Sequence, residues 1–341
     1  MSLPVRLSSF IALALSPLVL ALGCREKPVP IAYLGVVDAG TYSPDGDYVP
    51  LDGGTDSNTP DTSIVAPPLT ATACSSSITL DGNPLEAVAG ISALPDADAI
   101  VIGNQDGIDL HALDSDGCPV SDSAFQSLGV GRITSVQALA GGVTLFSGTS
   151  GAGRVISSGS GNSICVTCAV SGRSILATST TNAFVASGGS SIQKLSFNDT
   201  DSVCDAAAFA VVDAPLVLAA SAQANVAWVG SLSVSSDSTV PSIKKLALDT
   251  GAVDTSVNIA ASQALCGIDA MLELGGKLYV VDSGCRRVVA FNATTGATVA
   301  VHETPESIPR GLTVLQNGDL LLASAADAGT RSTVTFAHLT P

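Results

Sequence analysis

A pattern of short apolar strands recurs along the chain and constrains its fold more than any other feature. The segments "IKKLALDTGA" at 243–252 and "RRVVAFNATTG" at 286–296 show it well, because each has basic residues, an alternating apolar run, an Asp or Asn and a Thr-Gly turn. Recurrence at about forty residues indicates one structural unit used several times. One strand of the unit is found at six places: "IVIG" (100–103), "TLFS" (144–147), "FVAS" (184–187), "AWVG" (227–230), "YVVD" (279–282) and "LLAS" (321–324).

Each of these strands has similar neighbours in the sequence. Another apolar run and a turn precede it, and a third strand follows, usually closed by Asp or Asn, as in "RRVVAFN". Antiparallel strands in sets of four, repeated every ~40 to 50 residues, are typical of β-propeller blades. We therefore expect an all-β fold, a six-bladed propeller over residues 74–341. Five or seven blades also fit, since several first strands contain few large apolar residues.

The two ends of this domain are expected to meet in one blade. The last unit ends soon after its third strand, and the strand-like segment "CSSSITL" (74–80) precedes the first unit. The sequence therefore predicts that this N-terminal strand closes the final blade as its outermost strand.

Composition supports a β protein and argues against nucleic acid as a partner. Only 13% of residues are charged, and the net charge of −16 would repel a phosphate backbone. Of the 30 acidic residues, 25 are Asp and five are Glu, so the acidity lies mainly in turns rather than on helix faces.

The first residues form a targeting segment. Arg6 is followed by an uncharged apolar run from Phe10 to Leu22, then by Gly23 and Cys24. A basic start and a short apolar run are typical of a secretory signal, and the run is short for a membrane span. An ordinary cleaved secretory peptide and an uncleaved anchor are the alternatives to the lipoprotein signal described next.

The "LALGC" end of this segment resembles the lipobox of bacterial lipoproteins. The resemblance implies that residues 1–23 are the signal peptide and that Cys24 is acylated, which anchors the chain to a membrane. Arg25 follows where inner-membrane lipoproteins carry Asp, so the implied address is the bacterial cell envelope, at the outer membrane. The leaflet stays open.

Residues 24–73 are expected to form a flexible tether after the acylated cysteine. Pro, Gly, Asp, Ser and Thr dominate this segment, and its apolar residues have no sustained period.

Two longer phrases resemble the NHL and YVTN-type propellers of secreted bacterial proteins. They are "KLYVVDSGCRRVVAFNATTG" (277–296) and "IPRGLTVLQNGDLLLAS" (308–324). The resemblance implies the propeller fold and leaves the function open.

The cysteines predict one disulfide. "CGIDAMLELGGKLYVVDSGC" is a hairpin centred on Gly275 and Gly276, and folding it there places Cys266 opposite Cys285. With Cys24 acylated, seven cysteines remain, so one is expected to be free or joined to another molecule. The pairing of the other five is left open: Cys74, Cys118, Cys165, Cys168 and Cys204.

The sequence predicts a binding protein rather than an enzyme. No histidine has a His or Cys neighbour at metal-ligand spacing, and no catalytic residues or cofactor are expected. The predicted partner is a protein or a glycan, and a purely structural role in the envelope is an alternative. The polar insertion "SVSSDSTVPS" (233–242) is the first place to look for contact, although a plain surface loop is the favoured interpretation of it. The enzymatic alternative is a calcium-dependent, gluconolactonase-like hydrolase, whose channel ion would be held by Glu86, Asn104, Asp269 and Asp282.

Overall fold

The computed structural model describes most of the chain beyond residue 65. It covers residues 66–81, 87–105, 107–127, 132–157, 163–187, 189–198, 203–234, 239–254, 259, 265–327 and 331–340. The predicted signal peptide, Cys24 and the tether up to residue 65 lie outside this part. Within it, no helix is long and apolar enough to cross a membrane.

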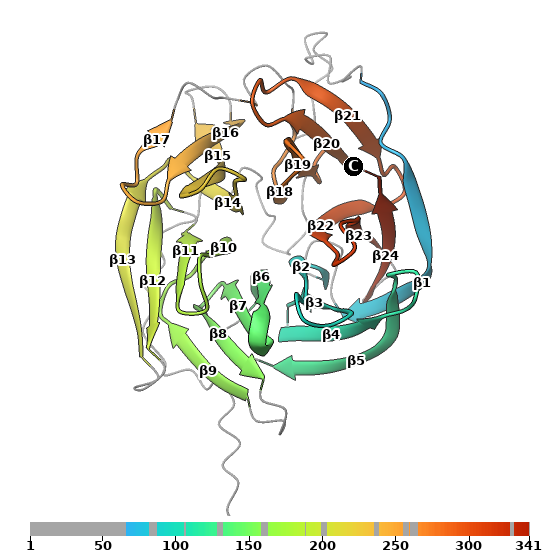
Figure 1. Cartoon of the computed structure of the whole chain (residues 1–341), viewed down its shortest axis with the longest axis horizontal. Helices are drawn as coiled ribbons and strands as arrows, with labels where there is room; N and C mark the ends of the chain where they lie inside the picture. The colour runs from blue at the N-terminus through green and yellow to red at the C-terminus, as the bar shows by residue number, and fades with distance from the viewer. Residues whose placement is uncertain are drawn as a thin grey trace, which may run out of the picture.

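Six four-stranded antiparallel sheets stand in a ring around a central channel (Figure 1). This arrangement confirms the six-bladed β-propeller. Blades 1 to 3 are β2 (Gly90–Ala93), β3 (Ala99–Gly103), β4 (Gly107–Leu113), β5 (Pro119–Ser127); β6 (Ile133–Leu139), β7 (Val143–Gly148), β8 (Ala152–Ser157), β9 (Ser163–Cys168); and β10 (Ser174–Ala177), β11 (Asn182–Ala186), β12 (Ser191–Asn198), β13 (Val203–Val211). A 3-10 turn, η1 (Ala140–Gly142), joins β6 to β7.

Blades 4 to 6 complete the ring. They are β14 (Pro215–Ala220), β15 (Val226–Val234), β16 (Thr239–Ala247), β17 (Val253–Asp254); β18 (Ala270–Leu274), β19 (Lys277–Asp282), β20 (Arg287–Asn292), β21 (Thr298–Glu303); and β22 (Ile308–Val314), β23 (Leu320–Asp327), β24 (Arg331–Leu339), β1 (Ala71–Asp81). The first strand of each blade in this order lies at the channel. The fourth lies at the rim.

The apolar core of the described residues is divided among the blade interfaces. It consists of six clusters, and each joins side chains of two adjacent blades. Strand β19 shows why, since Leu278 and Val280 pack toward blade 4 while Tyr279 and Val281 pack toward blade 6. Because strand side chains alternate between faces, a strand buried on both faces is apolar throughout.

The ring is closed by the N-terminal strand, as the sequence predicts. Strand β1 pairs antiparallel with β24, from Ala71 opposite Leu339 to Asp81 opposite Arg331. In Figure 1 the blue strand β1 lies at the rim beside the red strand β24. The closing blade is therefore built from both ends of the domain.

The propeller includes residues that the sequence places in the tether. Pro68 forms a parallel bridge with Val301 of β21, and the Leu69 amide donates to the Val301 carbonyl at 2.7 Å. Leu69 is buried in the cluster between blades 5 and 6. Residues 66–70 thus lie along the outer edge of blade 5 before the chain enters β1, and the domain extends N-terminally of residue 74.

The polar insertion at 233–242 is not a simple loop between strands. Its two ends belong to β15 and β16, which stay paired from Val226 opposite Ala247 to Val234 opposite Thr239. Val and Thr favour extended backbone, so the insertion lengthens the hairpin. Its residues 235–238 lie outside the described part.

We expect ring closure to limit stability. Ile78 of β1 is buried between blades 6 and 1, so Ile78→Ala should lower the free energy of unfolding by about 2–5 kcal/mol in urea titrations. Thr79→Ala, on the exposed face of the same strand, is the matched control and should change it by less than about 0.5 kcal/mol. Equal effects of the two variants would contradict the closing role of β1.

Candidate functional site

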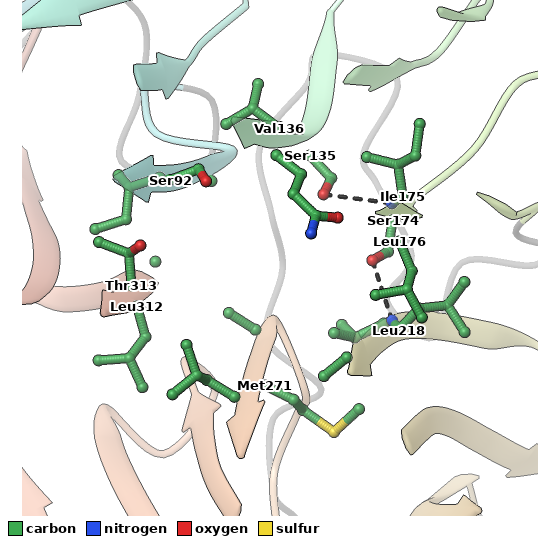
Figure 2. A pocket seen from close by; sticks show the side chains of 18 of the residues that line it. Ser92, Ser135, Val136, Ser174, Ile175, Leu176, Leu218, Met271, Leu312 and Thr313 are labelled. Atoms are coloured by element: carbon green, nitrogen blue, oxygen red, sulfur yellow. Dashed lines mark hydrogen bonds between the residues drawn. The ribbon is translucent and has the colours of Figure 1, made fainter. Parts of the chain in front are cut away.

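The central channel contains a cavity. The first strands of all six blades line it, and its volume is about 270 Å³. Figure 2 looks into it, with Ser92, Ser135, Ser174 and Thr313 on one arc and Met271 on the opposite side. The cavity is too small for a drug-sized molecule and suits a small one.

Side chains of one blade hydrogen-bond the innermost strand of the next. The innermost strand of a sheet has an edge without a partner strand, so its N–H groups need other acceptors. Serine, threonine and glutamine oxygens supply them. The contacts are Ala93 N to Thr313 Oγ1 (2.9 Å), Ala138 N to Ser92 Oγ (2.9 Å), Ile175 N to Ser135 Oγ (3.4 Å), Ala177 N to Gln137 Oε1 (2.6 Å) and Leu218 N to Ser174 Oγ (3.0 Å).

Blade 5 uses carboxylates in place of hydroxyls. Glu273, near the end of β18, accepts hydrogen bonds from the Trp228 indole (2.5 Å), the Ser221 hydroxyl (2.9 Å) and the Ala222 amide (3.1 Å) of blade 4. The Lys245 ammonium also lies over the Trp228 ring, 4.8 Å from its centre, in a cation–π contact. Glu273 therefore joins blades 4 and 5 at one end of the channel.

Asp269 joins blade 5 to blade 6 at the other end of the channel. It directly precedes β18 and forms an ion pair with Arg310 at 2.8 Å, and it accepts a hydrogen bond from Ser283. Arg310 also donates to the Val88 carbonyl at 3.1 Å, which extends the contact to blade 1. Asp269 is partly exposed, so this mouth of the channel presents a charged group that is already paired.

Asp282 lies in a different environment although it belongs to the same blade. It is fully buried, contacts Arg287 at 3.0 Å and accepts from the amides of Cys266 and Gly267. Burial raises the pKa of the Asp282 carboxyl, while Arg287 and the amides of Cys266 and Cys285 oppose the rise. The carboxylate thus fastens the loop before β18 to the turn after β19.

Three of the four residues of the calcium hypothesis are engaged by protein groups. The Asn104 side chain donates to Asp109 and accepts from the Gly107 amide, in the turn between β3 and β4. Asp269 is paired with Arg310, and Asp282 with Arg287. Glu86 lies outside the described residues, so calcium binding stays a prediction.

Two groups of potential metal ligands occur among the described residues, and disulfides account for both. One contains Cys74, Cys118 and His338, and the other contains Cys266, Asp282 and Cys285. In each group the two cysteines are bonded to one another.

Of the disulfides among the described residues, one lies within blade 5 and two join neighbouring blades. Cys266 is paired with Cys285 (Cα atoms 5.4 Å apart), in register with the hairpin whose turn residues Gly275 and Gly276 both have positive φ. Cys74–Cys118 links the rim of blade 6 to blade 1, and Cys168–Cys204 links blades 2 and 3. Cys168 belongs to the segment "CVTC" at 165–168, and its disulfide gives it a structural role. The side chain of Cys165 lies outside the described part.

The channel residues that the sequence did not reveal are Glu273, Arg310 and the inner hydroxyls. A signal existed, because Ser92, Gln137 and Thr313 interrupt apolar first strands. Such interruptions left the number of blades open, whereas in the structure they provide the contacts between blades.

Comparisons with known proteins support the fold alone. No family model matches the chain, and no curated protein matches it. A structure described as a nidogen/laminin complex aligns with a TM-score of 0.51 at 12% identity, over 67% of this chain and 85% of that one. The WD40 β-propeller domain of Doa1 aligns with a TM-score of 0.51 at 14% identity, over 76% of this chain and 94% of that one. At such identities the common feature is the propeller architecture.

We expect Asp282 to matter for stability. Asp282→Asn leaves the buried Arg287 without its counter-charge, so the free energy of unfolding should fall by about 3–5 kcal/mol in urea titrations. Asp319→Asn, in an exposed turn, is the matched control and should be nearly neutral. A near-neutral Asp282→Asn would contradict the fastening role.

His302 gives a pH dependence of defined sign. Burial lowers the pKa of His302 in β21 below its ordinary value of 6.5, although Glu303 opposes this. The unfolded chain therefore takes up the proton first, and the stability contribution present above pH 6.5 is lost as the pH falls through the folded-state pKa. His302→Gln should flatten this part of the stability profile, measured by urea unfolding at a series of pH values. Identical stability profiles for the wild type and His302→Gln would refute this role of His302.

Proposed function

We propose that the protein is a lipid-anchored β-propeller of the bacterial cell envelope that binds a protein or glycan partner without turnover. Cys24 carries the anchor, the segment after it is the tether, and the loops and channel of the propeller meet the partner. The outer membrane is the proposed location.

The path of residues 66–70 carries this proposal. They lie along the outer edge of blade 5, and β1 continues along the rim of blade 6. A tether that joins at the rim leaves both loop faces of the ring accessible. Loops on a rigid scaffold are the usual carriers of binding function.

The use of charged side chains in the ring also supports binding. Asp269, Glu273 and Asp282 are hydrogen-bonded or ion-paired to neighbouring elements, so each contributes to the rigidity of the scaffold. A rigid binding surface loses little entropy when its partner docks.

One experiment tests the proposal directly. Crosslinking of the full chain in intact cells, followed by mass spectrometry, should capture the same partner repeatedly. Cys24→Ala should abolish lipid labelling, release the chain from the membrane fraction and reduce this capture.

Two results would contradict the proposal. If the Cys24→Ala variant stayed in the membrane fraction, the proposed lipid anchor at Cys24 would be wrong. Stoichiometric calcium on the purified full chain, with lactone hydrolysis that Glu86→Ala abolishes, would replace binding by the hydrolase alternative.

A further inference from the structure

The central cavity has a mixed polar and apolar lining. Its hydroxyl and amide side chains come from blades 6, 1, 2 and 3, beside apolar residues such as Val136 and Leu312, whereas blades 4 and 5 contribute Met271 and small apolar residues together with two carboxylates (Figure 2). A molecule that fills the cavity must therefore offer both polar and apolar groups.

The polar side chains of the lining have unused hydrogen-bond donors. The oxygens of Ser92, Ser135, Ser174 and Thr313 each accept an N–H from the next blade, which leaves the hydroxyl proton of each. Within the described part of the chain these four hydroxyl protons have no protein acceptor. Ser174 and Thr313 are only 5% and 7% exposed, and both line the cavity, so a molecule in the channel can supply the acceptor.

Gln137 adds a fifth donor to the same lining. Its Oε1 accepts from the Ala177 amide of blade 3, so the NH₂ group is the end that remains for a ligand. The lining therefore offers donors to a molecule that is rich in acceptor oxygens.

Charge decides between an anion and a neutral molecule. The chain has a net charge of −16, and two carboxylates, Asp269 and Glu273, line the cavity against one guanidinium, that of Arg173. An acidic protein disfavours the approach of anions through its long-range field. The acceptor oxygens should therefore belong to a neutral molecule, such as one with hydroxyl or ether groups.

We propose that the channel binds one neutral sugar residue, either free or at the end of a glycan. A pyranose ring has oxygens around its rim and an apolar C–H face, which matches the mixed lining of the cavity. A cavity of about 270 Å³ has room for one such ring. This inference deepens the proposed binding function, on which it rests, by naming the ligand class and the site.

The experiment titrates the purified full chain in detergent with D-glucose, D-galactose and N-acetyl-D-glucosamine, followed by calorimetry and saturation-transfer NMR. At least one neutral sugar should bind, and D-glucuronate, an anion of the same ring size, should bind more weakly. Thr313→Val and Ser174→Ala each remove one hydroxyl from the channel wall and should weaken binding about three- to ten-fold.

Thr298→Val is the matched control. Thr298 lies in the outer strand β21, and its hydroxyl has no hydrogen-bond partner, so its loss should leave sugar binding unchanged. Thermal unfolding and disulfide mapping of every variant separate loss of the ligand site from loss of the fold.

Three results would overturn the proposal: no binding of any neutral sugar, tighter binding of D-glucuronate, or equal binding by wild type, Thr313→Val and Ser174→Ala. If the chain captured a partner in cells but bound no sugar, this inference would be wrong and the proposed function would still stand.

Discussion

Burial of both faces of every blade is the constraint on which the structure depends. A single four-stranded sheet cannot hide two apolar faces, and each described apolar cluster is shared by two neighbouring blades. An open row of six blades would leave one apolar face exposed at each end. Closing the row into a ring removes both ends, which is why β1 from one end of the domain pairs with β24 from the other.

The innermost strands show how backbone N–H groups at the channel find hydrogen-bond acceptors in the same ring. Each has one unpartnered edge at the channel, and side chains of the preceding blade supply acceptors at four interfaces. Blade 5 differs by placing Glu273 toward blade 4 and Asp269 toward blade 6. The innermost strands thus add directional hydrogen bonds to the apolar packing that all the interfaces share, and two disulfides join neighbouring blades farther out.

Much of the fold could be predicted from the sequence because strand alternation and turn residues repeat locally. The six second strands, the closing strand and the Cys266–Cys285 hairpin all follow from such patterns. The pairings Cys74–Cys118 and Cys168–Cys204 could not, since they join different blades and depend on how these pack. The same holds for Arg310, whose partner Asp269 is 41 residues away in the sequence.

The hydroxyls of the channel have a structural role, to which we propose to add a binding role. An aliphatic residue at Ser174 or Thr313 would leave a buried N–H of the next blade without an acceptor, which costs about 1–3 kcal/mol. The ring therefore needs oxygen at these positions whether or not a ligand is present. Because a hydroxyl that accepts one hydrogen bond still has a proton to donate, the requirement of the fold creates a polar channel wall. Specificity for a ligand then depends on the rest of the lining, where Ala270 and Met271 are among the apolar residues.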